Sequence, residues 1–143
     1  MRDLIARLEA AQGPDPELCA LAVAAVVGGT VKRSPINGRW CVYVGTDHRG
    51  EPRLWEPRGA KWNDIQRALL NDRGPTASLD AALTLVPEGV DVEVYFSPRE
   101  KPHRRGCVVL TISRQVYEAH AATPALAVVI AALHARAAEG GPR

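Results

Sequence analysis

The chain has 143 residues, 46% of them hydrophobic, and a net charge of +2. This fits one domain whose core is large enough to need neither disulfides nor a structural metal. The longest apolar run, around residues 18–27, is too short to cross a bilayer, and charges interrupt residues 1–7 where a signal peptide would be apolar. We therefore expect a single cytoplasmic domain over residues 1–143 that does not bind a membrane.

Two helices are predicted at the N-terminal end. Residues 3–12 carry apolar side chains on one helical face, and the Gly-Pro pair at 13–14 ends the segment. Residues 15–17 then supply an Asp N-cap, a first-turn proline and a first-turn acid for a second helix. This helix is apolar on almost all sides up to the glycines at 28–29, so we expect it to be well buried.

The middle of the chain is predicted to hold a hairpin and a helix. Residues 40–44 are rich in β-branched and aromatic side chains, and a turn at residues 47–50 leads to a short return strand over residues 53–55. Prolines on both sides of the return strand suit an edge position. Apolar residues spaced i, i+3 and i+7 predict a helix over residues 62–70.

The C-terminal half is predicted to hold a helix, two strands and a last helix. Residues 76–86 carry an apolar stripe that predicts a helix. Asp80 falls in its first turn, where its carboxylate interacts favourably with the backbone N–H groups. Residues 90–96 alternate between apolar and polar, which predicts an antiparallel strand, and residues 107–113 are its partner. The link over residues 97–106 is long for a hairpin. The last helix opens at Thr123 and runs to residue 137.

The predicted order of elements is α-α-β-β-α-α-β-β-α. A parallel doubly wound sheet is disfavoured, because no strand–helix–strand unit with continuously apolar strands occurs. We expect an α+β fold in which an antiparallel four-stranded sheet is packed between helices. The cysteines are odd in number, widely spaced and in apolar surroundings, so we expect buried reduced thiols at Cys19, Cys41 and Cys107.

Three blocks of the chain resemble one family. Residues 76–89 (Thr-Ala-Ser-Leu-Asp-Ala-Ala-Leu-Thr-Leu-Val-Pro-Glu-Gly) look like the central motif of small phage and prophage proteins grouped as the phage α-β-α sandwich domain. Residues 123–136 resemble that family's C-terminal helix, and residues 8–18 resemble its N-terminal helix pair. The resemblance implies a phage-derived protein with a helix/sheet/helix sandwich in the cytoplasm of a host cell. It implies no activity, because the family has no catalytic signature to carry over.

The sequence lacks the spacings that mark common catalytic and metal sites: Cys-x-x-Cys, His-x-x-x-His, a phosphate loop or a nucleophile elbow. His103 and Cys107 are four residues apart, but one is predicted in a loop and the other in a strand. We interpret them as a solvent-facing histidine and a core thiol. His120 and His134 are predicted near or on the last helix, exposed or hydrogen-bonded. We therefore predict no enzymatic activity, no cofactor and no metal ion.

Positive charge gathers in two segments, and these are the candidate binding surfaces. Residues 97–106 contain four Lys or Arg against one acid, a net +3, and the candidate side chains are Arg99, Lys101, His103, Arg104 and Arg105. On a hairpin tip they could enter a nucleic-acid groove or meet an acidic protein surface. Alternatively, they form an ordinary solvated loop.

The second segment, residues 30–62, contains seven Lys or Arg against three acids, a net +4, together with all three tryptophans. The candidate side chains in this Arg/Trp segment are Arg39, Arg49, Arg53, Trp55 and Arg58. Mixed arginines and aromatics suit base stacking and protein hot spots equally. Alternatively, the tryptophans simply fill the core.

We predict from these observations a small, non-enzymatic phage or prophage accessory protein that binds a host or phage protein, for example to inhibit a host defence complex. The alternative is a nucleic-acid-binding module that uses the basic loop and the Arg/Trp segment, although a pI of about 8.6 gives it a modest electrostatic footprint. An exposed apolar strip on the second or last helix would, in addition, drive homodimerisation.

Overall fold

The computed structural model describes residues 1–33, 40–55 and 79–139. Its elements in chain order are α1 (Arg2–Ala10), α2 (Pro16–Val27), β1 (Thr30–Arg33), β2 (Trp40–Thr46), β3 (Pro52–Leu54), α4 (Leu79–Leu83), β4 (Asp91–Phe96), the 3-10 turn η1 (Pro102–Arg104), β5 (Gly106–Ile112), β6 (Gln115–Ala121) and α5 (Pro124–Ala138). The helix predicted over residues 62–70 lies outside the described residues. No described helix combines the length and the apolar character needed to span a bilayer.

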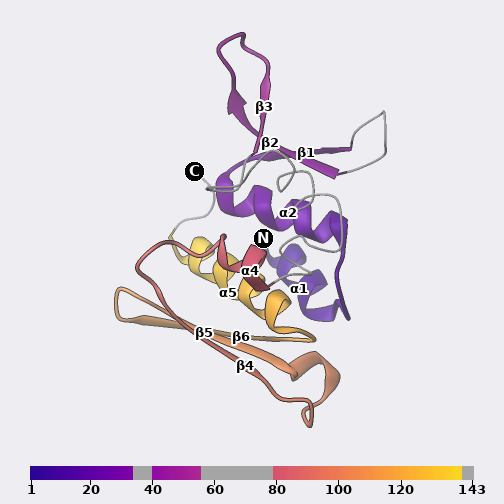
Figure 1. Cartoon of the computed structure of the whole chain (residues 1–143), viewed down its shortest axis with the longest axis vertical. Coiled ribbons are helices and arrows are strands. Elements are labelled where there is room, and N and C mark those ends of the chain that lie inside the picture. The colour runs from indigo at the N-terminus through magenta and orange to yellow at the C-terminus, as the bar shows by residue number, and fades with distance from the viewer. Residues whose placement is uncertain (34–39, 56–78, 140–143) are drawn as a thin grey trace.

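The fold is α+β, as predicted, but it has two antiparallel sheets rather than one four-stranded sheet. The first sheet has the order β1-β2-β3 and the second has the order β4-β5-β6. Figure 1 shows the helices lying between the two sheets, with α2 against the first and α5 against the second. The prediction of a single sheet packed between helices is therefore wrong in both strand count and layer order.

Two strands, β1 and β6, were not predicted from the sequence, and the reasons are physical. β1 is short and mostly exposed, with charged Lys32 and Arg33, so it lacks an apolar alternation. β6 contains good helix formers, and it is joined to β5 by a two-residue turn at Ser113 and Arg114. Both turn residues have positive φ, 49° and 70°, as in a type I′ turn. Such turns usually carry Asn-Gly, so this one has no visible signature in the sequence.

α5 is the centre of the core. Every residue from Ala125 to Leu133 is buried, because the second sheet covers one side of the helix while α1, α2 and α4 pack on others. The helix is therefore buried nearly all round over these residues. Its start is as predicted: Thr123 is the N-cap, and its side chain accepts a hydrogen bond from the Leu126 N–H at 3.2 Å.

The start of α5 rests on β5 at Gly106. A Cβ atom at Gly106 would lie 2.2 Å from the carbonyl carbon of Thr123 and 2.5 Å from the nitrogen of Pro124. Only glycine permits this approach of strand to helix. The contact holds the first residues of β5, including Cys107, at a fixed position beside α5.

Large exposed apolar side chains do not lie on α2 or α5. In the described part of the chain they are Met1, Leu79, Tyr95, Phe96 and Val116. The apolar strip that would drive homodimerisation through α2 or α5 is therefore not exposed there. Three of the five, Tyr95, Phe96 and Val116, belong to the edge strands of the second sheet, so this sheet carries most of the exposed large apolar side chains of the described residues.

Candidate functional site

The second sheet has one covered face and one outer face. Along β5, the buried Val108 and Leu110 face α5, so the half-buried Cys107 faces the other way. The strand register places Tyr95, Cys107 and His120 in one row across the three strands. This row crosses the sheet at the end that is next to the β4–β5 loop.

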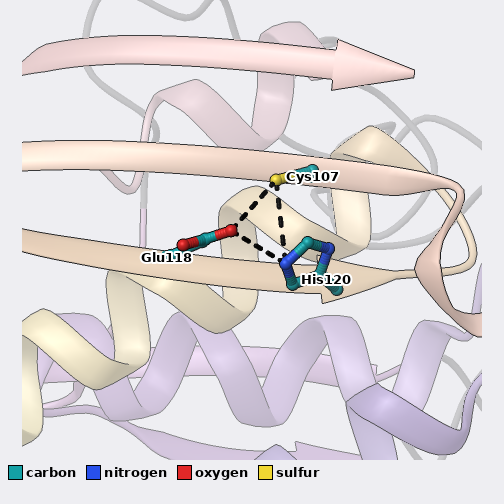
Figure 2. Close-up of side chains that lie close together, drawn as sticks. All are labelled: Cys107, Glu118 and His120. Carbon is teal, nitrogen blue, oxygen red and sulfur yellow. Dashed lines mark hydrogen bonds and ion pairs between the residues drawn. The ribbon is translucent and has the colours of Figure 1, made fainter. Parts of the chain in front are cut away.

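Cys107 forms a compact polar cluster with two side chains of β6, Glu118 and His120 (Figure 2). The Nε2 atom of His120 lies 2.9 Å from the Oε1 atom of Glu118. The Sγ atom of Cys107 lies 3.9 Å from the same Glu118 oxygen and 4.0 Å from His120 Nε2. One sulfur, one nitrogen and one oxygen therefore converge on a common point.

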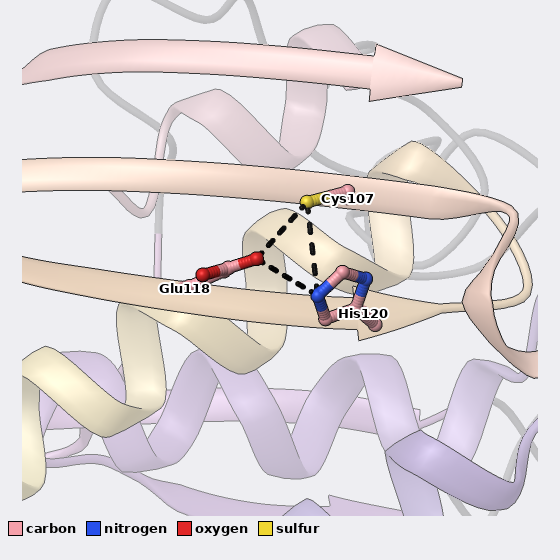
Figure 3. A network of polar contacts seen from close by, with 3 residues as sticks. All are labelled: Cys107, Glu118 and His120. Atoms are coloured by element: carbon pink, nitrogen blue, oxygen red, sulfur yellow. Dashed lines mark hydrogen bonds and ion pairs between the residues drawn. The ribbon is translucent and has the colours of Figure 1, made fainter. Parts of the chain in front are cut away.

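The cluster does not have the geometry of a catalytic triad. In such a triad, one ring nitrogen of the histidine faces the nucleophile and the other is held by the carboxylate. In Figure 3 both contacts of His120 end on the same nitrogen, Nε2, and the buried Nδ1 has no hydrogen-bond partner among the described residues. The arrangement therefore gathers donor atoms around one point instead of relaying a proton.

The electrostatics also oppose a nucleophilic role for Cys107. Burial raises the pKa of the Cys107 thiol, and the charge and hydrogen bond of Glu118 raise it further, while Arg104 lowers it. Reactive cysteines have a lowered pKa, because the thiolate is the attacking species. A thiol-dependent enzyme is therefore poorly supported by this site.

A cavity of about 280 Å³ borders the cluster at the β6 edge. Three of the four histidines in the chain lie on its wall, and they come from η1, β6 and α5. The lining residues are Glu9, His103, Arg104, Glu118, Ala119, His120, Ile130 and His134. His120 lies in β6, close to the start of the last helix, and it is hydrogen-bonded, as predicted. It belongs to both the cluster and the cavity wall.

The basic loop is an ordered extension of the β4–β5 hairpin. The Ser97 N–H donates to the Arg105 carbonyl at 2.8 Å, the Glu100 N–H donates to the Ser97 carbonyl at 3.1 Å, and the Arg104 N–H donates to the Lys101 carbonyl at 2.8 Å. With the last two residues of β4, Tyr95 and Phe96, the loop forms a surface of residues 95–105, which we name the basic tip. Tyr95 is 52% exposed and Phe96 is 59% exposed.

The predicted candidates of the basic loop all lie on this tip, and all are exposed: Arg99, Lys101, His103, Arg104 and Arg105. Within residues 1–33, 40–55 and 79–139, none of its four Lys and Arg side chains forms an ion pair. Arg105 instead donates to the backbone carbonyl of Glu100 at 3.4 Å. The tip therefore presents positive charge and two aromatic rings to the solvent.

The Arg/Trp segment lies elsewhere. Arg49 and Arg53 are exposed on the β2–β3 hairpin, at the opposite end of the molecule from the second sheet (Figure 1). Trp55, directly after β3, is half-buried and packs against the core, as one of the sequence interpretations proposed. Arg39 and Arg58 lie outside the described residues. The described part of the Arg/Trp segment that carries Arg49 and Arg53 therefore does not share a surface with the basic tip.

Comparisons of the chain with protein-family models, with curated proteins and with solved structures give no match.

The sequence analysis missed Glu118 and His120 because it missed β6. The relevant signal is the register: a two-residue turn at Ser113 and Arg114 pairs Cys107 with His120 and Val109 with Glu118. The predicted burial of the thiols is correct for Cys19, whereas Cys41 and Cys107 are only half-buried, and none of the three forms a disulfide in the part of the chain that the structure describes.

Proposed function

We propose that this protein is a non-enzymatic binding module that docks on an acidic protein surface through the basic tip. The observation that carries the proposal is the exposure of Tyr95 and Phe96 beside four Lys and Arg side chains that form no ion pair with any residue that the structure describes. Aromatic residues and arginine are the side chains that dominate protein–protein binding energy. Four cations against one acid in the loop select a partner of opposite charge.

A protein partner fits better than a nucleic acid because of the charges behind the tip. The outer face of the second sheet carries exposed carboxylates at Asp91, Glu93 and Glu118. The Tyr95 hydroxyl donates a hydrogen bond to Glu93 Oε2 at 2.8 Å. A base stacked on the Tyr95 ring would therefore lie close to a carboxylate. A phosphate backbone laid along this face would be repelled, whereas a protein contact confined to the tip would avoid it.

Origin from a phage, and inhibition of a host defence complex, remain proposals that rest on the family resemblance. The basic tip supports only the narrower statement that the partner is a protein with an acidic surface. A phage accessory protein that blocks a host complex would be one protein of that kind.

The proposal is tested with two probes of equal charge: a labelled glutamate-rich peptide with interspersed leucine and tryptophan, and a labelled single-stranded DNA. We expect the peptide to bind more tightly than the DNA at physiological salt. The triple variant Arg99→Gln, Lys101→Gln, Arg105→Gln should lose more than about tenfold in peptide affinity, because each rim charge contributes several tenths of a kcal/mol or more.

The matched control neutralises the other hairpin, with Arg49→Gln and Arg53→Gln, and should leave peptide affinity unchanged. Tighter binding of the DNA, with a steep salt dependence that the triple variant removes, would replace the protein-binding proposal by the nucleic-acid alternative. Equal losses in the triple variant and the control would show non-specific charge attraction and also contradict the proposal.

A further inference from the structure

We propose that Cys107, Glu118 and His120 form a binding site for Zn²⁺ on the outer face of the second sheet. The ligand atoms are Cys107 Sγ, Glu118 Oε1 and His120 Nε2, which all lie within 4.8 Å of one another. They come from adjacent strands that are paired along their full length, so the backbone already holds the three side chains together. The site adjoins the basic tip, because Tyr95 pairs with Cys107 across β4 and β5, but none of its three ligands belongs to the tip and it does not depend on the tip's proposed partner.

The distances between the ligand atoms are close to those of a tetrahedral zinc site. Zinc bonds of about 2.0–2.3 Å at tetrahedral angles place ligand atoms about 3.3–3.6 Å apart. The observed separations are 2.9 Å for nitrogen to oxygen, 3.9 Å for sulfur to oxygen and 4.0 Å for sulfur to nitrogen. Each differs from the tetrahedral range by about half an ångström or less, which side-chain rotation provides without moving the strands.

The chemistry of the ligands selects the metal. A thiolate with an imidazole favours Zn²⁺ and other borderline or soft ions over Mg²⁺ and Ca²⁺, which prefer oxygen ligands only. A thiolate and a carboxylate together supply two negative charges, which balance a divalent ion. Three protein ligands leave a fourth position open, and the Glu118 side chain is 58% exposed, so an ion can enter from the solvent.

The neighbouring cavity is the rival location for a metal. Its wall includes His103 and His134 beside His120, and histidine is a common zinc ligand. In the described part of the chain, however, the only group of three or more metal-ligating side chains with donor atoms this close is the Cys107 cluster. The two locations share Glu118 and His120. They differ in Cys107, which belongs only to the cluster, and in His103 and His134, which belong only to the cavity, so variants of these residues distinguish them.

The test is a Co²⁺ titration of the full-length chain, reduced and stripped of metal, followed by displacement with Zn²⁺. We expect one equivalent of Co²⁺ to give a thiolate-to-cobalt charge-transfer band in the near ultraviolet and intense visible bands of four-coordinate geometry. Zn²⁺ should abolish both. Cys107→Ser should remove the charge-transfer band, and His120→Ala and Glu118→Gln should each weaken binding by more than about tenfold.

The matched controls are Cys41→Ser for the thiol, and His103→Ala and His134→Ala for the cavity. All three should keep the band and the affinity. The proposal is overturned by the absence of a charge-transfer band in the wild-type chain, by its survival in Cys107→Ser, or by a loss of affinity in His103→Ala or His134→Ala that matches the loss in His120→Ala. Far-ultraviolet circular dichroism confirms that each variant is folded, and the exposed Glu118 keeps the test decisive if a half-buried variant unfolds.

Discussion

At the scale of single residues, Gly106 and His120 have tertiary contacts that the sequence does not indicate. Gly106 appears as one glycine in a basic loop, yet the backbone of Thr123 occupies the space that any side chain would need. His120 appears as an isolated histidine, yet its ring nitrogen lies 2.9 Å from Glu118 and 4.0 Å from Cys107. Both properties depend on contacts between distant parts of the chain, so local patterns could not predict them.

Replacing Gly106 by alanine should destabilise the protein by about 1–3 kcal/mol or more, because backbone atoms rather than a flexible side chain block the new Cβ. Gly13→Ala is the matched control: no atom lies within 4 Å of a Cβ there, and the change should stay within about 0.5 kcal/mol. Urea unfolding measures both variants. Equal stability of the two would show that β5 and α5 do not meet as described.

At the scale of elements, the sequence predicted the helices that begin with a recognisable N-cap. The Asp15 and Thr123 caps were read correctly, because a side-chain oxygen followed by proline is a strong helix start, and both accept the expected backbone hydrogen bond. The β5–β6 hairpin was missed because Ser113 and Arg114 adopt positive φ without the usual residues. The sequence therefore predicted the β4–β5 pair but not β6, and without β6 the Cys107 cluster could not be predicted.

The same turn gives a prediction about stability. Replacing Ser113 by asparagine and Arg114 by glycine should stabilise the protein by about 0.5–2 kcal/mol, because these residues adopt left-handed backbone conformations at lower cost. Thermal unfolding followed by circular dichroism should show a raised midpoint. A lowered midpoint would mean that the turn has a different conformation. Placing the same pair at Asp47 and His48, neither of which has a positive φ, should give no such gain, because a glycine there only adds conformational freedom to the unfolded chain.

At the scale of the whole molecule, the two sheets differ in what they expose. The first sheet packs on α2, and its β2–β3 hairpin, which carries Arg49 and Arg53, lies at one end of the molecule. The second sheet carries the basic tip and the Cys107 cluster and borders the cavity. α5 packs against the inner face of this sheet and lines part of the cavity. The net charge of +2 could not show this separation, because it depends on which segments the fold brings near one another.

The central claim is that partners bind at the basic tip of the second sheet and not at the β2–β3 hairpin. The most direct measurement is a map of backbone amide chemical shifts in the ¹⁵N-labelled chain, titrated with the glutamate-rich peptide. We predict that the largest shifts fall on residues 95–105 and that residues 47–53 stay unchanged. Shifts centred on residues 47–53, or spread evenly over both hairpins, would contradict the account.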